Sequence, residues 1–240
     1  MPGWRNWLDA RDLKSLDRKV VPVRLRPWAR GDIIDTMNKK SIVSRFYKLN
    51  ERLYKSAKDP LKSHGPDHHL RVCLNAIKIA EKVKKEVDFE VLIPAALLHD
   101  LSAYYPEETG DKYHEKDYKI ALNVLRKEKF PKQKISNVLD VIENHGSDPR
   151  YRKSNESIET TILRDADKLE AFGPIGLARI IMVRTQRGDT LNQIVDDFYL
   201  KGHLKKKYDS IKFPFVKKIA KPEFEYSMSF LRELKNGLGV

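Results

Sequence analysis

The chain has 240 residues, which is enough to bury one hydrophobic core. No apolar run approaches the roughly 20 residues of a membrane-spanning helix, so the sequence excludes a protein held in a membrane by such a helix. The formal net charge of +13 agrees with three classes: an enzyme for anionic substrates, a protein with a solvated basic surface, or a nucleic-acid-binding protein. The lysines are spread over many segments, which favours the first of these classes.

The cysteine content bears on the compartment. Cys73 is the only cysteine of the sequence, so an intramolecular disulfide is excluded and a reducing compartment is favoured. The N-terminus lacks an apolar signal core, and we therefore expect a cytoplasmic protein that does not act at a membrane. Cys73 shares a helical spacing with Leu70, Ala76 and Ile77, which predicts packing in the core rather than chemistry.

The composition divides the chain into two parts. Residues 1–36 contain all three tryptophans and an Arg- and Pro-containing segment, and their periodicity is poor. We interpret them as a basic, Trp-containing N-terminal extension. Residues 37–240 show apolar repeats of helical period, while alternating strand patterns are scarce and Asn236-Gly237 is the only hairpin dipeptide. The sequence therefore predicts an all-α fold, with one domain over 37–240.

Helices are expected wherever apolar residues recur at helical spacing between breakers. Residues 175–187 are very apolar, so we expect that helix to be central in the fold. The three lysines at 205–207 are interpreted as a solvated face. Polar loops are expected at 106–111, as a rim or lid, and at 148–155. The expected helices cover residues 42–54, 66–87, 89–104, 115–127, 131–145, 157–172, 175–187, 196–207 and 213–235, the last interrupted at Pro222.

Two ionisable residues, His99 and Asp100, end the apolar run from Val91 to Leu98. A helix that is apolar all round is normally buried, and a buried charge is costly unless it is paired or binds a metal. One nitrogen and one oxygen donor suit a catalytic divalent ion with an open coordination position. His68, in a first helical turn, and Asp167 are the two further donors that we place on the same ion.

Each of these further donors also has a structural explanation. A histidine in a first helical turn, such as His68, is commonly a surface residue, and Asp167 has Arg164 and Lys168 nearby as ion-pair partners. A set of two nitrogens and two oxygens would leave coordination positions for water and for a phosphate oxygen. The sequence thus predicts a metal site, provided that the four residues converge.

The order His68, His99-Asp100, Asp167 resembles that of the HD-domain metal-dependent phosphohydrolase superfamily. The stretch 68–72 fits its H-x-x-R-V element, 95–100 fits its buried HD helix, and 165–169 fits its D-A-D-[KR]-L element. The following stretch, 170–179, is similar to E-A-x-G-x-I-G-x-A-R of a subgroup of small stand-alone bacterial and archaeal HD proteins. The resemblance covers residue 37 to the C-terminus, and residues 1–36 have no counterpart in it.

The resemblance implies an HD-type helical bundle and one divalent ion, Mn, Fe, Co, Ni or Mg, with a second ion left open. The implied metal ligands are His68, His99, Asp100 and Asp167. Asp167 is chosen over Asp165 because the second Asp of the D-A-D element is the ligand in the superfamily, and Asp165 would then support the fold. His64 is expected near the mouth of the pocket, and His203 is given no role.

Acid–base and phosphate-binding roles remain open. Position 103 is alanine, so the Glu or His that follows the HD pair by three residues in other members is absent. The catalytic candidates are Asp100, His114 and His145, and either histidine could instead contact phosphate or a second ion. Lys168 and Arg71 are the phosphate-binding candidates, although Arg71 could instead brace a ligand carboxylate.

These features predict an enzyme: a metal-dependent phosphohydrolase in which a metal-activated water attacks phosphorus. Nucleotides or related phosphate esters are the expected small-molecule substrates. Nucleoside tri- or monophosphates are favoured over cyclic nucleotides, because the second histidine typical of cyclic-nucleotide phosphodiesterases is missing. The alternatives are a signalling phosphodiesterase for cyclic or dinucleotides, and a non-catalytic nucleic-acid-binding protein on an HD scaffold. The sequence leaves the oligomeric state open.

Overall fold

The computed structural model describes residues 30–105, 113–146 and 156–239, with side chains from residue 38 in the first range and from 115 in the second. These residues form helices and no strand, which confirms the predicted all-α class. The loops expected at 106–111 and 148–155, and residues 1–29 of the expected extension, lie outside the described residues. No helix in the described ranges combines the length and the apolar character that crossing a membrane requires.

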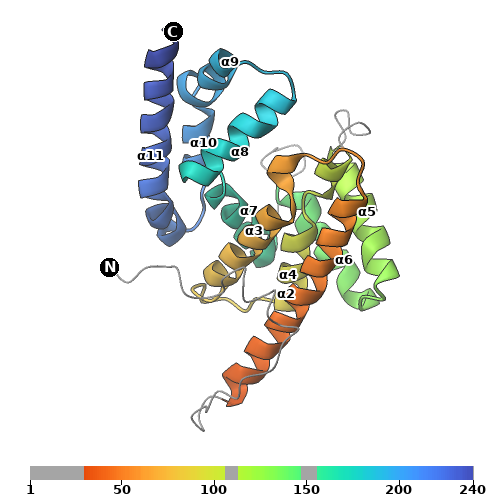
Figure 1. Cartoon of the computed structure of the whole chain (residues 1–240). Coiled ribbons are helices and arrows are strands. Elements are labelled where there is room, and N and C mark those ends of the chain that lie inside the picture. The colour runs from red at the N-terminus through yellow and green to blue at the C-terminus, as the bar shows by residue number, and fades with distance from the viewer. Residues whose placement is uncertain (1–29, 106–112, 147–155, 240) are drawn as a thin grey trace, which may run out of the picture.

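The buried helix α4 lies at the centre of the first group of helices. It packs against α2, α3, α6 and α7, and every residue from Val91 to Leu98 is buried. Figure 1 shows the long helix α2 running along this group. The elements of the group are α2 (Arg30–Ser56), η3 (Lys62–His64), α3 (Pro66–Ala80), α4 (Phe89–Leu98), η4 (Leu101–Tyr104), α5 (Tyr113–Lys127), α6 (Lys132–Asn144) and α7 (Ile158–Leu169).

The C-terminal helices form a second group on one side of the first (Figure 1). The long helix α11 lies on the outside of this group and packs against α8, α9 and α10. Contacts between α8 and η3 join the two groups. The elements are α8 (Gly173–Gln186), α9 (Leu191–Val195), the single π-helical turn η7 (Asp196–Leu200), α10 (His203–Asp209) and α11 (Pro214–Leu238).

Several helix ends differ from the expectation. Helix α2 is described from Arg30 onward, so it includes residues of the expected extension. Helix α3 stops at Ala80 rather than at 87, and the charged residues 81–86 connect it to α4. The predicted interruption at Pro222 is wrong, because α11 continues through it. A proline removes one backbone hydrogen bond, and the packing of this long helix on its neighbours compensates for the loss.

Helix α8 is not central, contrary to the expectation from its apolar composition. Ile175 is 53% exposed and Met182 is 43% exposed, whereas Leu177 and Ile180 are buried. The helix packs against α11 and η3. The apolar composition therefore predicts that this segment is helical, but it does not predict which side chains of the helix are buried and which are exposed.

Two glycines determine how α8 follows α7. Gly173 has a φ of +74°, which glycine adopts readily, and its N–H donates to Ser227 Oγ at 2.8 Å. A Cβ added at Gly176 would lie 2.3 Å from the carbonyl carbon of Ala171. Since this obstructing atom belongs to the backbone, helix α8 can approach the end of α7 so closely only with glycine at position 176.

We predict that Gly176→Ala destabilises the protein. Replacing glycine by alanine inside a helix normally stabilises it by up to about 1 kcal/mol, but the clash with Ala171 should cause a net loss of at least about 1 kcal/mol. For a chain of this length, that corresponds to a melting temperature roughly 2–4 °C lower. Gly237→Ala is the matched control, because nothing lies within 4 Å of its added Cβ in α11. A melting temperature for Gly176→Ala equal to or above that of the control would contradict the prediction.

Candidate metal centre

The end of α4 orients the pair His99 and Asp100. The helix ends at Leu98, and Asp100 has left helical geometry with φ −119° and ψ 38°. His99 Nε2 and Asp100 Oδ2 then lie 3.3 Å apart. His99 Nδ1 lies 2.9 Å from the Ala96 carbonyl oxygen, and since a carbonyl only accepts, Nδ1 is the protonated nitrogen. The lone pair of His99 Nε2 is therefore available to a ligand.

His68 reaches the same place from the first turn of α3, which begins at Pro66. Its side chain is buried, and its Nε2 lies 3.7 Å from Asp167 Oδ1 on α7. Its Nδ1 lies 3.9 Å from Glu170 Oε2. The surface position that a histidine in a first turn commonly takes is thus not the one observed.

The structure brings the four expected ligands together. Donor atoms of His68, His99 and Asp167 lie within 4.8 Å of one another, and the same holds for His99, Asp100 and His145. A third such group contains His64, His68 and Asp100. The groups share members, so they form one continuous cluster of imidazole and carboxylate donors, which we call the donor cluster.

The chemistry of the donor cluster fits a divalent cation. His68 Nε2 and His99 Nε2 are buried and have no hydrogen-bond partner among the described residues, which is costly unless something else binds them. Burial holds the pKa of His68 well below its ordinary value, so its imidazole is neutral, as metal binding requires. Although burial opposes ionisation of Asp100, His99 and His145 outweigh it and hold the pKa of that carboxyl well below its usual range.

Charges around Asp100 shift the pKa values of its neighbours. Burial lowers the pKa of His64 to about 4. Burial also opposes protonation of His145, but the hydrogen bond to Asp100 and the charge of that carboxylate outweigh it and raise the pKa of His145 to about 9. Burial, together with the charge of Asp100, raises the pKa of Asp117 to about 8. A carboxyl group that holds a proton near neutral pH therefore lies close to the donor cluster.

Asp117 was not identified from the sequence. It projects from α5, and its Oδ1 accepts a hydrogen bond of 2.6 Å from the backbone N–H of Ser102. The predicted catalytic candidate His114 lies three residues earlier on the same helix, but its side chain is outside the described residues. Positions three apart share a helix face, which is the signal that could have suggested Asp117.

A buried polar chain fixes the backbone just before His99. Asn50 Nδ2 donates to the carbonyl oxygen of Leu97 at 2.6 Å, and the Tyr104 hydroxyl donates to Asn50 Oδ1 at 2.5 Å. The Tyr104 hydroxyl oxygen also lies 3.3 Å from His69 Nδ1. These contacts tie α2, α3 and η4 to the end of α4. None of them was expected, because the residues are far apart along the chain.

The two cations expected at a phosphate have other partners. Arg71 Nε donates to Glu170 Oε2 at 2.6 Å, and this same carboxylate oxygen approaches His68 Nδ1. Arg71 thus braces a carboxylate beside the donor cluster. Lys168 is buried, and its Nζ donates to the Ser210 carbonyl oxygen at 2.6 Å. Neither Arg71 nor Lys168 lines the cavity that contains Asp100, His145 and Asp167, whereas Arg71 lines a neighbouring cavity together with His68 and Arg179.

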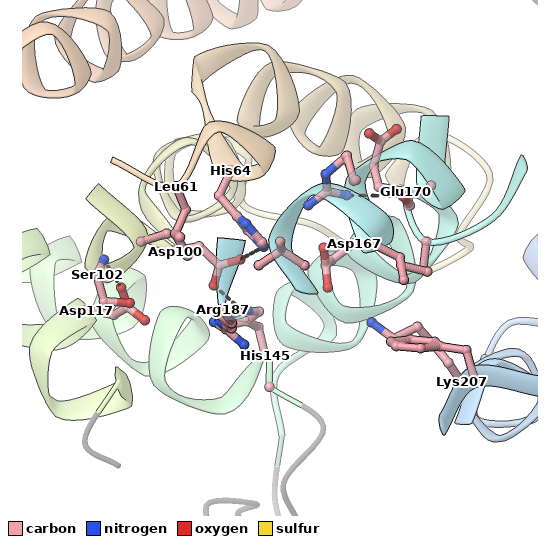
Figure 2. A pocket seen from close by; sticks show the side chains of 18 residues that line it. Leu61, His64, Asp100, Ser102, Asp117, His145, Asp167, Glu170, Arg187 and Lys207 are labelled. Atoms are coloured by element: carbon pink, nitrogen blue, oxygen red, sulfur yellow. Dashed lines mark hydrogen bonds and ion pairs between the residues drawn. The ribbon is translucent and has the colours of Figure 1, made fainter. Parts of the chain in front are cut away.

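A cavity of about 360 Å³ opens on the donor cluster, between the two groups of helices. Figure 2 shows Asp100, His145 and Asp167 facing this cavity, with Lys207 extending toward Asp167 from α10 on the other side. The charge of Lys207 contributes to the low pKa of Asp167, against the effect of burial. Lys207 is half-buried here, so the interpretation of residues 205–207 as a solvated face does not hold for it.

Comparison with known protein families identifies this arrangement. The HD domain family model matches residues 67–171, a range that contains His68, His99, Asp100 and Asp167. The chain carries an HD domain. The resemblance seen in the sequence is thereby confirmed, and the HD domain spans the elements from α3 to the end of α7. No curated protein matches the sequence.

Solved structures extend the likeness beyond the HD domain. The Lin1889 protein from Listeria innocua is 22% identical, with a TM-score of 0.60 over 84% of this chain and 98% of that one. YpgQ from Bacillus subtilis, in complex with ADP, is 20% identical, with a TM-score of 0.60 over 81% and 97% of the two chains. An HD-superfamily hydrolase from Bacillus thuringiensis is 21% identical, with a TM-score of 0.60 over 84% and 99%. At these identities the likeness shows the fold, and it includes the C-terminal helices.

Substitutions of two aspartates on α7 should distinguish a loss of metal binding from a loss of stability. The carboxylate of Asp165 accepts from the N–H of Lys212 at 2.8 Å and of Phe213 at 2.9 Å, whereas Asp167 faces the donor cluster. We predict that Asp167→Asn abolishes the rise in melting temperature that Mn²⁺ causes in the wild type. At 100 times the dissociation constant, that rise corresponds to about 2.7 kcal/mol. Asp165→Asn should lower the melting temperature without Mn²⁺ and keep the rise.

The two variants can be compared by thermal unfolding with and without Mn²⁺, and by the Mn²⁺ content of the dialysed proteins. Loss of Mn²⁺ in Asp165→Asn, with full retention in Asp167→Asn, would reverse the assignment of these two carboxylates.

Proposed function

We propose that this protein is a metal-dependent phosphohydrolase that acts on nucleotides or related phosphate esters. The observation that carries the proposal is the pair of buried, unpartnered nitrogens, His68 Nε2 and His99 Nε2, beside the carboxylates of Asp100 and Asp167. In our proposal these four residues hold one divalent ion. A bound divalent ion would lower the pKa of a water molecule and would neutralise charge on a phosphate oxygen.

The chain itself supplies groups for proton transfer. His145 Nε2 lies 3.3 Å from Asp100 Oδ1 at the cavity wall, and His145 Nδ1 lies 2.5 Å from the Ile142 carbonyl oxygen, which fixes the orientation of the ring. In the proposal Asp100 orients the attacking water, and His145 exchanges a proton with the reacting oxygens at Nε2. His114, whose side chain is outside the described residues, stays a second candidate for this role.

Two cations beside the expected metal ligands support a phosphate subsite. Arg179 Nε donates to the Ser63 carbonyl oxygen at 2.7 Å, and its Nη1 donates to the Glu170 carbonyl oxygen at 3.1 Å. These two contacts fix the guanidinium at the cavity wall. Lys207 reaches the cavity from α10. We propose that Arg179 and Lys207, rather than Lys168 and Arg71, offset the phosphate charge, since fixed cations stabilise charge that develops on the transferring phosphoryl group.

Cavity size and a related structure support a nucleotide as substrate. The volume of about 360 Å³ falls in the range of small-molecule sites. YpgQ, which shares the fold, has been solved in complex with ADP. The class of phosphohydrolase rests on the donor cluster, and the choice of nucleotides rests on these two further points.

We predict that the wild type releases phosphate or pyrophosphate from members of a panel of nucleoside mono-, di- and triphosphates in the presence of Mn²⁺, Co²⁺, Ni²⁺ or Mg²⁺. Chelation should abolish the activity, and adding the ion back should restore it. Asp100→Ala should lower kcat by more than about 100-fold, because losing an outer partner of a metal ligand already costs up to that much.

Turnover can be followed by phosphate release and by chromatography of the products. Equal activity of wild type and Asp100→Ala would refute the enzymatic proposal. Exclusive release of linear mononucleotides from cyclic or dinucleotides would instead favour the alternative of a signalling phosphodiesterase.

We predict that Lys207→Ala raises KM for the nucleotide substrate about tenfold or more, because a charge-assisted contact to phosphate is lost. Lys206→Ala is the matched control, since Lys206 is exposed on the same helix and does not line the cavity. The measurement is the ratio of KM values for the two variants. Equal KM values would remove Lys207 from the phosphate subsite.

A further inference from the structure

Helix α8 lines one wall of the cavity at the donor cluster. The residues of α8 that line it recur every three or four positions, so they form one stripe of the helix. At 1.5 Å per residue the stripe from Arg179 to Arg187 is about 12 Å long. Arg179 marks the end next to the ligands, because it is bonded to the carbonyl oxygens of Ser63 and Glu170. Arg187 marks the far end.

Phe198 lines the cavity toward that far end. It lies on η7, and the centre of its ring is 5.5 Å from the guanidinium carbon of Arg184. Arg184 is five residues beyond Arg179 on α8, which is about 7.5 Å along the helix axis. The ring is half-buried, and its edge-on neighbour is His203, with the ring centres 6.4 Å apart.

The turn that carries Phe198 is held in place by ion pairs. Arg184 Nη2 donates to Asp197 Oδ2 at 2.6 Å, and Lys201 Nζ lies 3.0 Å from Asp197 Oδ1. Ile194 and Val195, just before the turn, are buried. A π-helical turn is rare and is frequently found at functional sites. The aromatic ring is therefore fixed in position before any ligand binds.

Charged and apolar side chains share the lining of the cavity. Carboxylates, histidines and the cations Arg179 and Lys207 line it at the donor cluster. Ile180, Val183 and Phe198 form an apolar wall along α8, and the cation Arg187 lies at the far end of the stripe. If the phosphate of a substrate binds at the donor cluster, the uncharged part of that substrate would contact this apolar wall. A sugar phosphate or an inorganic polyphosphate has no group that would gain from an aromatic wall, whereas a nucleoside phosphate has a flat base.

We propose that Phe198, with Ile180 and Val183 beside it, binds the base of a nucleoside phosphate and is the specificity-determining residue of this cavity. The inference rests on the proposed function for the position of the phosphate, and it adds how the substrate is recognised. Stacking on an aromatic side chain accepts every base, since each has a flat face. The wall therefore selects nucleotides over other phosphate esters without selecting strongly among bases.

The test compares pairs of hydrolysis-resistant ligands that differ only by a nucleoside: the α,β-methylene analogues of ADP and UDP, against methylenediphosphonate. Their dissociation constants are measured by titration calorimetry on the Mn²⁺-loaded full chain. Phe198→Leu keeps an apolar side chain but removes the aromatic face. We expect it to weaken binding of at least one nucleotide analogue about tenfold, within the range for a lost base stack, and to leave methylenediphosphonate within about twofold. Phe198→Tyr, which keeps an aromatic face, should bind the nucleotide analogues as tightly as the wild type does.

Tyr199→Ala is the control for loosening of the turn, because Tyr199 is the next residue of η7 and does not line the cavity. It should leave both classes of ligand unchanged. Equal weakening of nucleotide and diphosphonate in Phe198→Leu, no weakening of either, or failure of the wild type to bind the nucleotide analogues would overturn the inference.

Because the readout is binding, the inference and the proposed function can fail separately. Selective loss of the nucleotide analogues in a protein that turns over no phosphate ester would refute the hydrolase and keep the base-binding wall. Turnover of nucleotides with no selective loss in Phe198→Leu would keep the hydrolase and refute the wall.

Discussion

Burial of His68 and His99 with unpartnered ring nitrogens is the constraint on which this structure depends. Two imidazoles in an interior of this kind destabilise the fold unless a ligand completes their bonding. The neighbouring residues hold these imidazoles in place but do not supply hydrogen bonds to the unpartnered nitrogens. The Ala96 carbonyl orients the ring of His99, and the hydrogen bonds through Tyr104 and Asn50 fix the backbone before it. The fold is therefore less stable than it could be at the place where we expect metal binding and catalysis, as is common at functional sites.

The scaffold around this point explains why one helix is so apolar. Helix α4 is surrounded by α2, α3, α6 and α7, and it delivers His99 and Asp100 at its end, where the backbone departs from helical geometry. The other donors come from four further elements: η3, α3, the end of α6, and α7. A single rigid centre therefore sets the geometry of the whole donor cluster, and rigid supporting elements hold such sites more accurately than loops do.

Much of this could be predicted from the sequence, and the exceptions have physical reasons. The motifs around His68, His99 and Asp167 predicted which side chains would converge, because they resemble those of a superfamily in which these residues share one ion. The contacts of the basic side chains near these motifs could not be predicted in this way. Arg71 follows His68 by three residues and Lys168 follows Asp167 directly, yet Arg71 contacts Glu170 and Lys168 contacts Ser210.

Arg179, Lys207 and Phe198 were missed for the complementary reason. They come from the C-terminal helices, which the packing of α8 against η3 and the hydrogen bonds of Ser210 and Lys212 to α7 hold beside the cavity. Helix α8 shows the same limit: its apolar residues line a cavity and an outer surface as well as the core. The HD domain match ends at residue 171, before any of these side chains. In the two proposals made above, ion binding and ligand choice reside on consecutive stretches of the chain. Exchanging the stretch after 171 among proteins of this fold would then transfer selectivity while leaving the proposed metal ligands in place.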